Sequence, residues 1–172
     1  MPIVSTDLKL RLSGGVSNTD PAASIGGAMS TEAGGVITTA ELNNLFDNVT
    51  GDESAAGMVD YRCVYIENDH ATITWEAVKL WIATVSASTD SVYAIALDGG
   101  GLNATAEVES DEDTPPTGET FSSPTTKAAG LSLGDMDAGD NYPIWIRRTI
   151  SSGASANNSD GPTIRFEGDT GA

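Results

Sequence analysis

The stretch RCVYIENDHATITWEAVKLWI, residues 62–82, holds two β-rich runs on either side of an Asn-Asp turn. The first run is β-branched and aromatic and ends at Asn68. The second run, which continues as far as Val85, alternates apolar and polar side chains. Short runs of this composition, separated by turn residues, are typical of strands. The stretch therefore predicts two paired strands.

The same alternation continues to the C-terminal end of the chain. It recurs in SVYAIALD (91–98), YPIWIRRTI (142–150) and PTIRFEGDT (162–170), with Gly, Pro, Asn and Asp in the segments between. No apolar pattern of helical length separates these runs, so we do not expect a parallel sheet. Six to eight short strands predict an all-β fold, an Ig-like or jelly-roll β-sandwich, over residues 60–172.

Residues 1–59 have a different composition and are expected to hold one strand, an extended arm and one short helix. The strand is predicted where Leu8, Leu10 and Leu12 alternate with basic residues, which gives one apolar and one basic face. Such a strand is half-buried, and its apolar face could belong to the sheet of a neighbouring chain.

The arm is predicted at residues 14–35, where Gly, Ala, Ser and Thr dominate and almost nothing can enter a core. We expect this segment to be mobile in the free protein and ordered on a partner. A helix is predicted in TTAELNNLFDNV (38–49), because Thr38 and Glu41 have the spacing of a capping box.

The charge of the chain limits its partners. Its 25 Asp and Glu residues outnumber 8 Lys and Arg residues, which gives a formal net charge of -17. Such a chain repels phosphate backbones, so we expect no nucleic-acid partner. No run approaches the roughly 20 apolar residues of a membrane span, and the N-terminus lacks the apolar core of a secretory signal. We expect a protein made in the cytoplasm that does not bind membranes.

Cys63 and His70 are the only residues of their types, and they could face each other across a hairpin as a catalytic Cys-His pair. Cys63 alternates with Tyr61 and Tyr65 in a predicted strand, where a cysteine is usually a small buried hydrophobe. One cysteine and one histidine also cannot form a zinc shell. We therefore predict a structural Cys63, a loop His70, no catalytic or cofactor-binding residues, and no enzyme.

The acidic segment DMDAGDN, Asp135 to Asn141, has two interpretations. Three carboxylates and an amide in one loop could supply oxygen ligands to calcium. However, Ile146 stands at the twelfth position, where an EF-hand loop requires glutamate. The sequence leaves a calcium loop open but favours an acidic turn, and we assign no metal ligands.

Two tryptophans and one arginine are candidates for an interface. If Val78 and its alternate neighbours face the core, Trp81 faces outward, and Trp145 and Arg147 share the outer face of another strand. Either both sandwich faces are partly covered by other parts of the chain, or these residues mark a partner surface, because Trp and Arg are enriched at interface hot spots. We therefore take as candidate interface residues Leu8, Leu10, Leu12, Trp81, Trp145 and Arg147.

Several phrases together resemble small virion structural proteins of tailed bacteriophages. They are LKLRLSGG, SNTDPAASIGGAMST, NNLFDNVTGDESAAG, YRCVYIEN, VKLWI and IWIRRTISSGA, which span most of the chain. The resemblance implies a structural role in the virion and no catalytic residues.

The expected function is a capsid decoration (cement) protein, forming homo-oligomers on the particle and binding the major capsid protein through its N-terminal third. A tail or baseplate component is one alternative. The other is a host-surface carbohydrate-binding module in which Trp81 and Trp145 stack on sugars.

Overall fold

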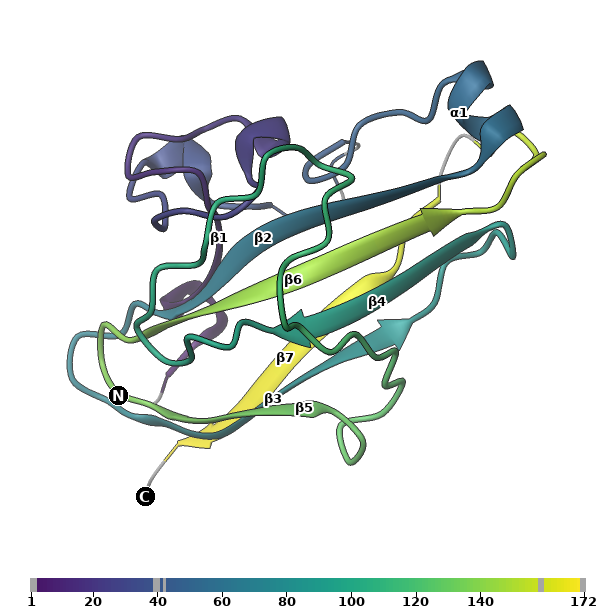
Figure 1. Cartoon of the computed structure of the whole chain (residues 1–172). Helices are drawn as coiled ribbons and strands as arrows, with labels where there is room; N and C mark the ends of the chain where they lie inside the picture. The colour runs from purple at the N-terminus through teal and green to yellow at the C-terminus, as the bar shows by residue number, and fades with distance from the viewer. Residues whose placement is uncertain (1–2, 39–40, 42, 158–159, 171–172) are drawn as a thin grey trace.

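The computed structural model describes residues 3–38, 41, 43–157 and 160–170. Within them, two antiparallel sheets stack face to face, so the predicted all-β sandwich is confirmed (Figure 1). In spatial order, the four-stranded sheet contains β1 (Leu8–Leu12), β2 (Met58–Asn68), β6 (Asn141–Ile150) and β4 (Ser91–Leu97). The three-stranded sheet contains β5 (Leu131–Met136), β3 (Trp75–Thr84) and β7 (Thr163–Thr170).

From β2 onward, each strand lies in the opposite sheet from the strand before it. The predicted pairing of β2 with β3 is therefore wrong. The buried Asn68 fixes the crossover between them, because its side-chain amide donates to the carbonyls of Ile73 and Met136, each at 2.9 Å. The division into four and three strands matches constant-type Ig domains, whereas the order β1-β2-β6-β4 differs from the Ig order.

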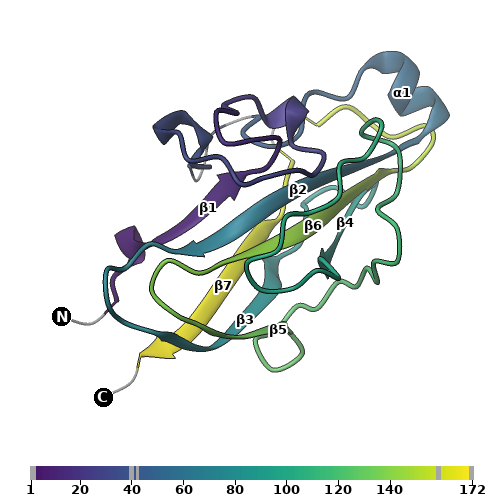
Figure 2. The ribbon, with the colours of Figure 1, turned by 60° about the vertical axis from the view of Figure 1, so that its left-hand side comes forward.

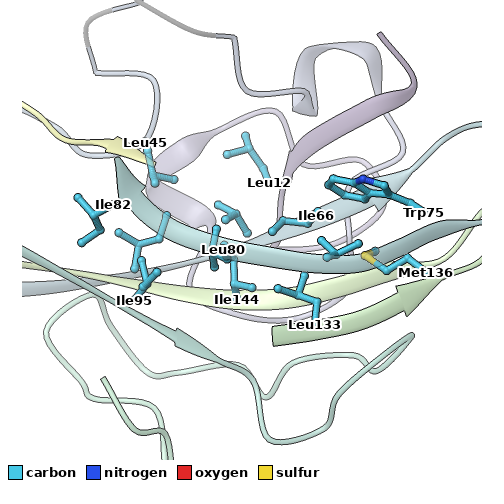
Figure 3. Packing of buried hydrophobic residues seen from close by; sticks show 13 residues of the cluster. Leu12, Leu45, Ile66, Trp75, Leu80, Ile82, Ile95, Leu133, Met136 and Ile144 are labelled. Carbon is cyan, nitrogen blue, oxygen red and sulfur yellow. The ribbon is translucent and has the colours of Figure 1, made fainter. Parts of the chain in front are cut away.

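The main core fills the space between the two sheets. Side chains that alternate inward from β2, β3, β4 and β6 meet there, and Figure 3 shows them facing one another. Trp75 packs edge-on against Phe166 of β7, with ring centroids 5.9 Å apart. The buried members are Leu12, Leu45, Val64, Ile66, Trp75, Val78, Leu80, Ile82, Ile95, Leu133, Met136, Ile144 and Ile146.

A second core lies on the other face of the four-stranded sheet. Cys63 and Tyr65 of β2 point outward there, beside Ala96 of β4 and Trp145 of β6. Two loops, residues 13–35 and 98–123, cover these side chains, and we call them together the outer loop layer (Figure 2). The two central strands of this sheet, β2 and β6, are therefore buried on both faces.

The segment 14–35 is not an extended arm, so that prediction is wrong. It folds back on its own sandwich: Ser30 N–H donates to Leu12 C=O at 2.9 Å, and Cys63 N–H donates to Ser24 C=O at 2.7 Å. The side chains of Ser24 and Ser30 are fully buried. Backbone hydrogen bonds, rather than apolar area, order this segment, which is why its composition gives no sign of it. Two short 3-10 turns lie within it, at Pro21–Ala23 and Ala33–Gly35, and another precedes β1 at Ser5–Asp7.

The short helix is also displaced from its predicted place. The helix α1 spans Gly51–Ala56, whereas the described residues of 38–49 are not helical; residues 39, 40 and 42 lie outside the described part. Two buried arginines bind carbonyls of this segment. Arg62 Nε donates to Leu45 C=O at 3.2 Å, and Arg148 Nη1 donates to Asp47 C=O at 2.7 Å.

A capping box is present at Thr50 and Glu53, at the start of α1. Thr50 Oγ1 accepts from the Glu53 amide at 3.3 Å, and the Glu53 carboxylate accepts from the Thr50 amide at 2.7 Å. Because that amide hydrogen bond favours the ionised carboxylate, it lowers the pKa of Glu53. These reciprocal bonds fix the start of α1.

Candidate interaction surface

The leucines of β1 face the chain's own core. β1 pairs antiparallel with β2; Leu12 is buried, and Leu8 and Leu10 pack at the edge of the main core. On the opposite face, Lys9 and Arg11 form ion pairs with acidic residues of β2 and the turn after it. The half-buried strand is confirmed, and its apolar face is occupied within the molecule.

Trp145 and Arg147 lie on the outer face of the four-stranded sheet, beneath the outer loop layer. Trp145 is only 1% exposed, and its Nε1 donates to the Asp98 carboxylate at 2.9 Å. The Arg147 guanidinium stacks over Phe121, 5.1 Å from the ring centroid. Other parts of the chain therefore cover this face of the sheet, which was one of the two interpretations of the sequence.

Trp81 lies on the outer face of the three-stranded sheet and is 6% exposed. The guanidinium of Arg165, from β7, lies 5.7 Å from its ring centroid. Glu167 holds the Arg165 side chain over Trp81. Its carboxylate lies 3.2 Å from Arg165 Nη2 and also accepts from Lys127 Nζ at 2.8 Å. The structure therefore does not bring Trp81 and Trp145 together, and neither indole ring is open to a sugar.

Cys63 and His70 are likewise not brought together. Cys63 lies fully buried in the second core, and burial raises the pKa of its thiol. His70 lies in the connection between β2 and β3, where its Nδ1 accepts from the amides of Thr72 and Ile73, both at 3.1 Å. The buried position predicted for Cys63 is confirmed.

The carboxylates of Asp135 to Asn141 bind groups of the protein itself. Asp135 accepts from the Ala77 amide at 2.8 Å, Asp137 from the Thr74 hydroxyl at 2.6 Å, and Asp140 from the Asn103 amide at 2.6 Å. Across the described residues, no three His, Cys, Asp or Glu side chains are arranged to hold a metal ion. Within this segment, residues 137–140 form the acidic turn between β5 and β6.

Two depressions in the surface are lined by carboxylates. A groove of about 640 Å³ lies between α1 and the ends of β2 and β6 and contains Glu53, Glu112 and Asp113. A smaller one of about 290 Å³ lies at the outer loop layer, where burial raises the pKa of Glu109 and Glu119. Both depressions disfavour anionic ligands.

The solvent-facing side of the outer loop layer combines exposed apolar side chains with a fixed backbone. Val16 belongs to the first loop, and Val108 belongs to the second; both are exposed. Gly27 lies against Val108 and against Gly14, so the two loops meet at that point. We call this the loop surface. Sequence reasoning missed it because exposed valines in loops have no periodicity.

Comparison of the chain with protein-family models, curated proteins and solved structures gives no match. In the described part of the chain, no helix is long and apolar enough to cross a membrane.

Proposed function

We propose that this protein is a non-enzymatic virion structural protein, a capsid decoration protein of a tailed bacteriophage. It binds the major capsid protein, stabilises the capsid lattice, and is present as a homo-oligomer on the particle after synthesis in the host cytoplasm. The observation that carries this proposal is the loop surface: Val16 and Val108 are exposed on loops that the chain's own hydrogen bonds hold in place.

Such a surface suits binding to a repeated lattice. Because the outer loop layer is already ordered, binding costs less conformational entropy than ordering a free arm would. The net charge of -17 keeps the protein soluble before assembly. The contact is therefore assigned to a folded surface in the N-terminal third and the 98–123 loop, and not to a strand donated to a neighbour.

The location of the chain in purified particles tests the proposal. Quantitative mass spectrometry should give a copy number that scales with the major capsid protein, and an averaged density map should place the chain on the capsid shell. A few copies at one vertex would instead indicate a tail or baseplate component, the alternative that the same fold also suits.

The contact surface is tested with matched aspartate variants. Val16→Asp combined with Val108→Asp should reduce binding to particles that lack the protein. Val92→Asp, at an exposed valine of β4, is the control and should leave binding unchanged. Equal binding by all variants would contradict the loop surface as the contact. No observation favours the carbohydrate-binding alternative, because both tryptophans on which it rested are buried.

A further inference from the structure

The strand β7 presents a long, regular and unpaired edge. Among the described residues, β7 pairs with β3 alone, and none of their backbone hydrogen bonds outside the ladders involves residues 163–170. The edges of the four-stranded sheet are covered, by Ile37 N–H to Leu10 C=O at 2.8 Å and by reciprocal bonds between Ser122 and Ile95. An unpaired strand of this length is a template for pairing with another chain.

The other edge of the three-stranded sheet is less suited to pairing. The ladder between β3 and β5 shifts register twice, and one shift places the extra residue, Leu133, on β5 itself. In the ladder between β3 and β7, both shifts place the extra residues on β3, so β7 runs without a bulge. A bulged edge strand resists edge-to-edge pairing, whereas a regular one permits it.

The charges on the outer side chains of β7 indicate which strand it pairs with. Arg165 and Glu167 are two residues apart, so both point to the solvent face of the sheet, with side chains 61% and 40% exposed. We infer that β7 pairs antiparallel with β7 of a second copy around a two-fold axis at Phe166. This register sets Arg165 opposite Glu167 of the second copy, and Glu167 opposite Arg165 of the second copy.

Neighbouring registers do not place opposite charges across from each other. A two-fold axis at Arg165 places two arginines directly opposite each other, and an axis at Glu167 does the same with two carboxylates. Like charges at directly opposed positions are destabilising, whereas opposite charges stabilise a strand pair. A shift of one residue would put the apolar face of one sheet beside the polar face of the other. The sequence of β7 therefore specifies the register at Phe166.

The charge distribution favours this edge over the rest of the surface. Two copies of a chain with a net charge of -17 repel each other, but Lys127 and Arg165 lie together beside β7. Because β7 is an edge strand of the three-stranded sheet, the proposed contact joins two such sheets into one continuous sheet. This inference concerns the free chain and does not depend on binding to a capsid.

Charge reversal in the full-length protein tests the pairing. The wild-type protein should be a dimer in analytical ultracentrifugation, with β7 amides protected from hydrogen exchange. Arg165→Glu or Glu167→Arg alone should dissociate it, because each places like charges opposite each other twice. The double variant Arg165→Glu/Glu167→Arg restores both opposite-charge pairs and should dimerise again. Asp52→Arg on α1 changes the charge as much as Glu167→Arg and should remain dimeric.

Several results would overturn the inference. They are a monomeric wild-type protein at the highest soluble concentration, a dimer insensitive to both single reversals, or a double variant that stays monomeric. Circular dichroism and thermal melting of every variant establish that it is folded, which the exposure of both side chains leads us to expect.

Discussion

Asp60 of β2 and Arg148 of β6 lie directly opposite each other and form an ion pair that is almost wholly buried between the two sheets. Arg148 Nε donates to the Asp60 carboxylate at 2.8 Å, and its guanidinium lies 4.7 Å from the centroid of the Phe46 ring. Burial raises the pKa of Asp60, although the hydrogen bond from Arg148 acts in the opposite direction. The pair thus anchors the segment before α1 to the sandwich.

Asp60→Ala should destabilise the protein strongly. Removing one partner of a buried pair leaves the other charge uncompensated, which costs about 3–5 kcal/mol of the free energy of unfolding. Urea denaturation measures this loss. The double variant Asp60→Leu/Arg148→Met removes both charges and should be more stable than Asp60→Ala. Asp52→Ala, at an exposed position of α1, is the control; a loss no larger than that of the control would contradict the role of the pair.

Gly26→Ala should loosen the outer loop layer. Gly26 has φ +104°, and a Cβ there would lie 1.8 Å from the Glu107 carbonyl oxygen, so the two loops would have to separate. The control is Gly15→Ala: Gly15 has φ +113°, but a Cβ there meets nothing within 4 Å. Gly26→Ala should lower the melting temperature more than Gly15→Ala, and speed hydrogen exchange at the Cys63 amide. An equal loss of melting temperature in both variants would mean that backbone strain at positive φ, and not the close approach to Glu107, causes the loss.

The strands could be predicted because their signal is local. Alternation in β1 placed its leucines correctly on one face. The covering segments could not be predicted. Residues 13–35 bind through backbone groups and small side chains such as Ser24, and hydrogen bonds of this kind leave no periodic pattern in a sequence.

The helix illustrates a different limit. Both Thr38-Glu41 and Thr50-Glu53 have capping-box spacing, so the local pattern cannot choose between them. The choice depends on Arg62 and Arg148, which lie far away in the sequence and whose guanidiniums bind the carbonyls before Thr50. The burial of Trp81 and Trp145 could not be predicted for a related reason: alternation shows which way a side chain points, but not whether another part of the chain covers it.

Glu109→Gln should stabilise the protein near neutral pH. Burial, and then the charge of Glu107, raises the pKa of Glu109 above its unfolded value of about 4.3. The stability that this shift contributes is therefore full below the unfolded pKa and is lost as pH rises through the folded pKa. Glutamine keeps an acceptor for the Thr117 amide and removes the charge. Thermal melting should show an advantage for Glu109→Gln that disappears at about pH 4.

Glu53→Gln provides a control of opposite sign. The hydrogen bond from the Thr50 amide lowers the pKa of Glu53, so its contribution is present above the unfolded pKa and is lost as pH falls through the folded pKa. Glu53→Gln should therefore melt lower than wild type near neutral pH, with the difference shrinking in acid. If both variants changed the melting temperature in the same direction, the loss of one negative charge would explain both changes without the two local environments.

Cys63 should report the opening of the outer loop layer. The thiol is fully buried beneath residues 13–35 and 98–123, and burial raises its pKa, so the reactive thiolate is scarce in the folded protein. A thiol reagent should leave native Cys63 unmodified over a period in which it labels the urea-unfolded chain completely. Gly26→Ala should speed labelling under native conditions, and Gly15→Ala should do so less. Fast labelling of the native wild-type protein would mean that the loops open readily, which would remove the fixed loop surface on which the capsid contact depends.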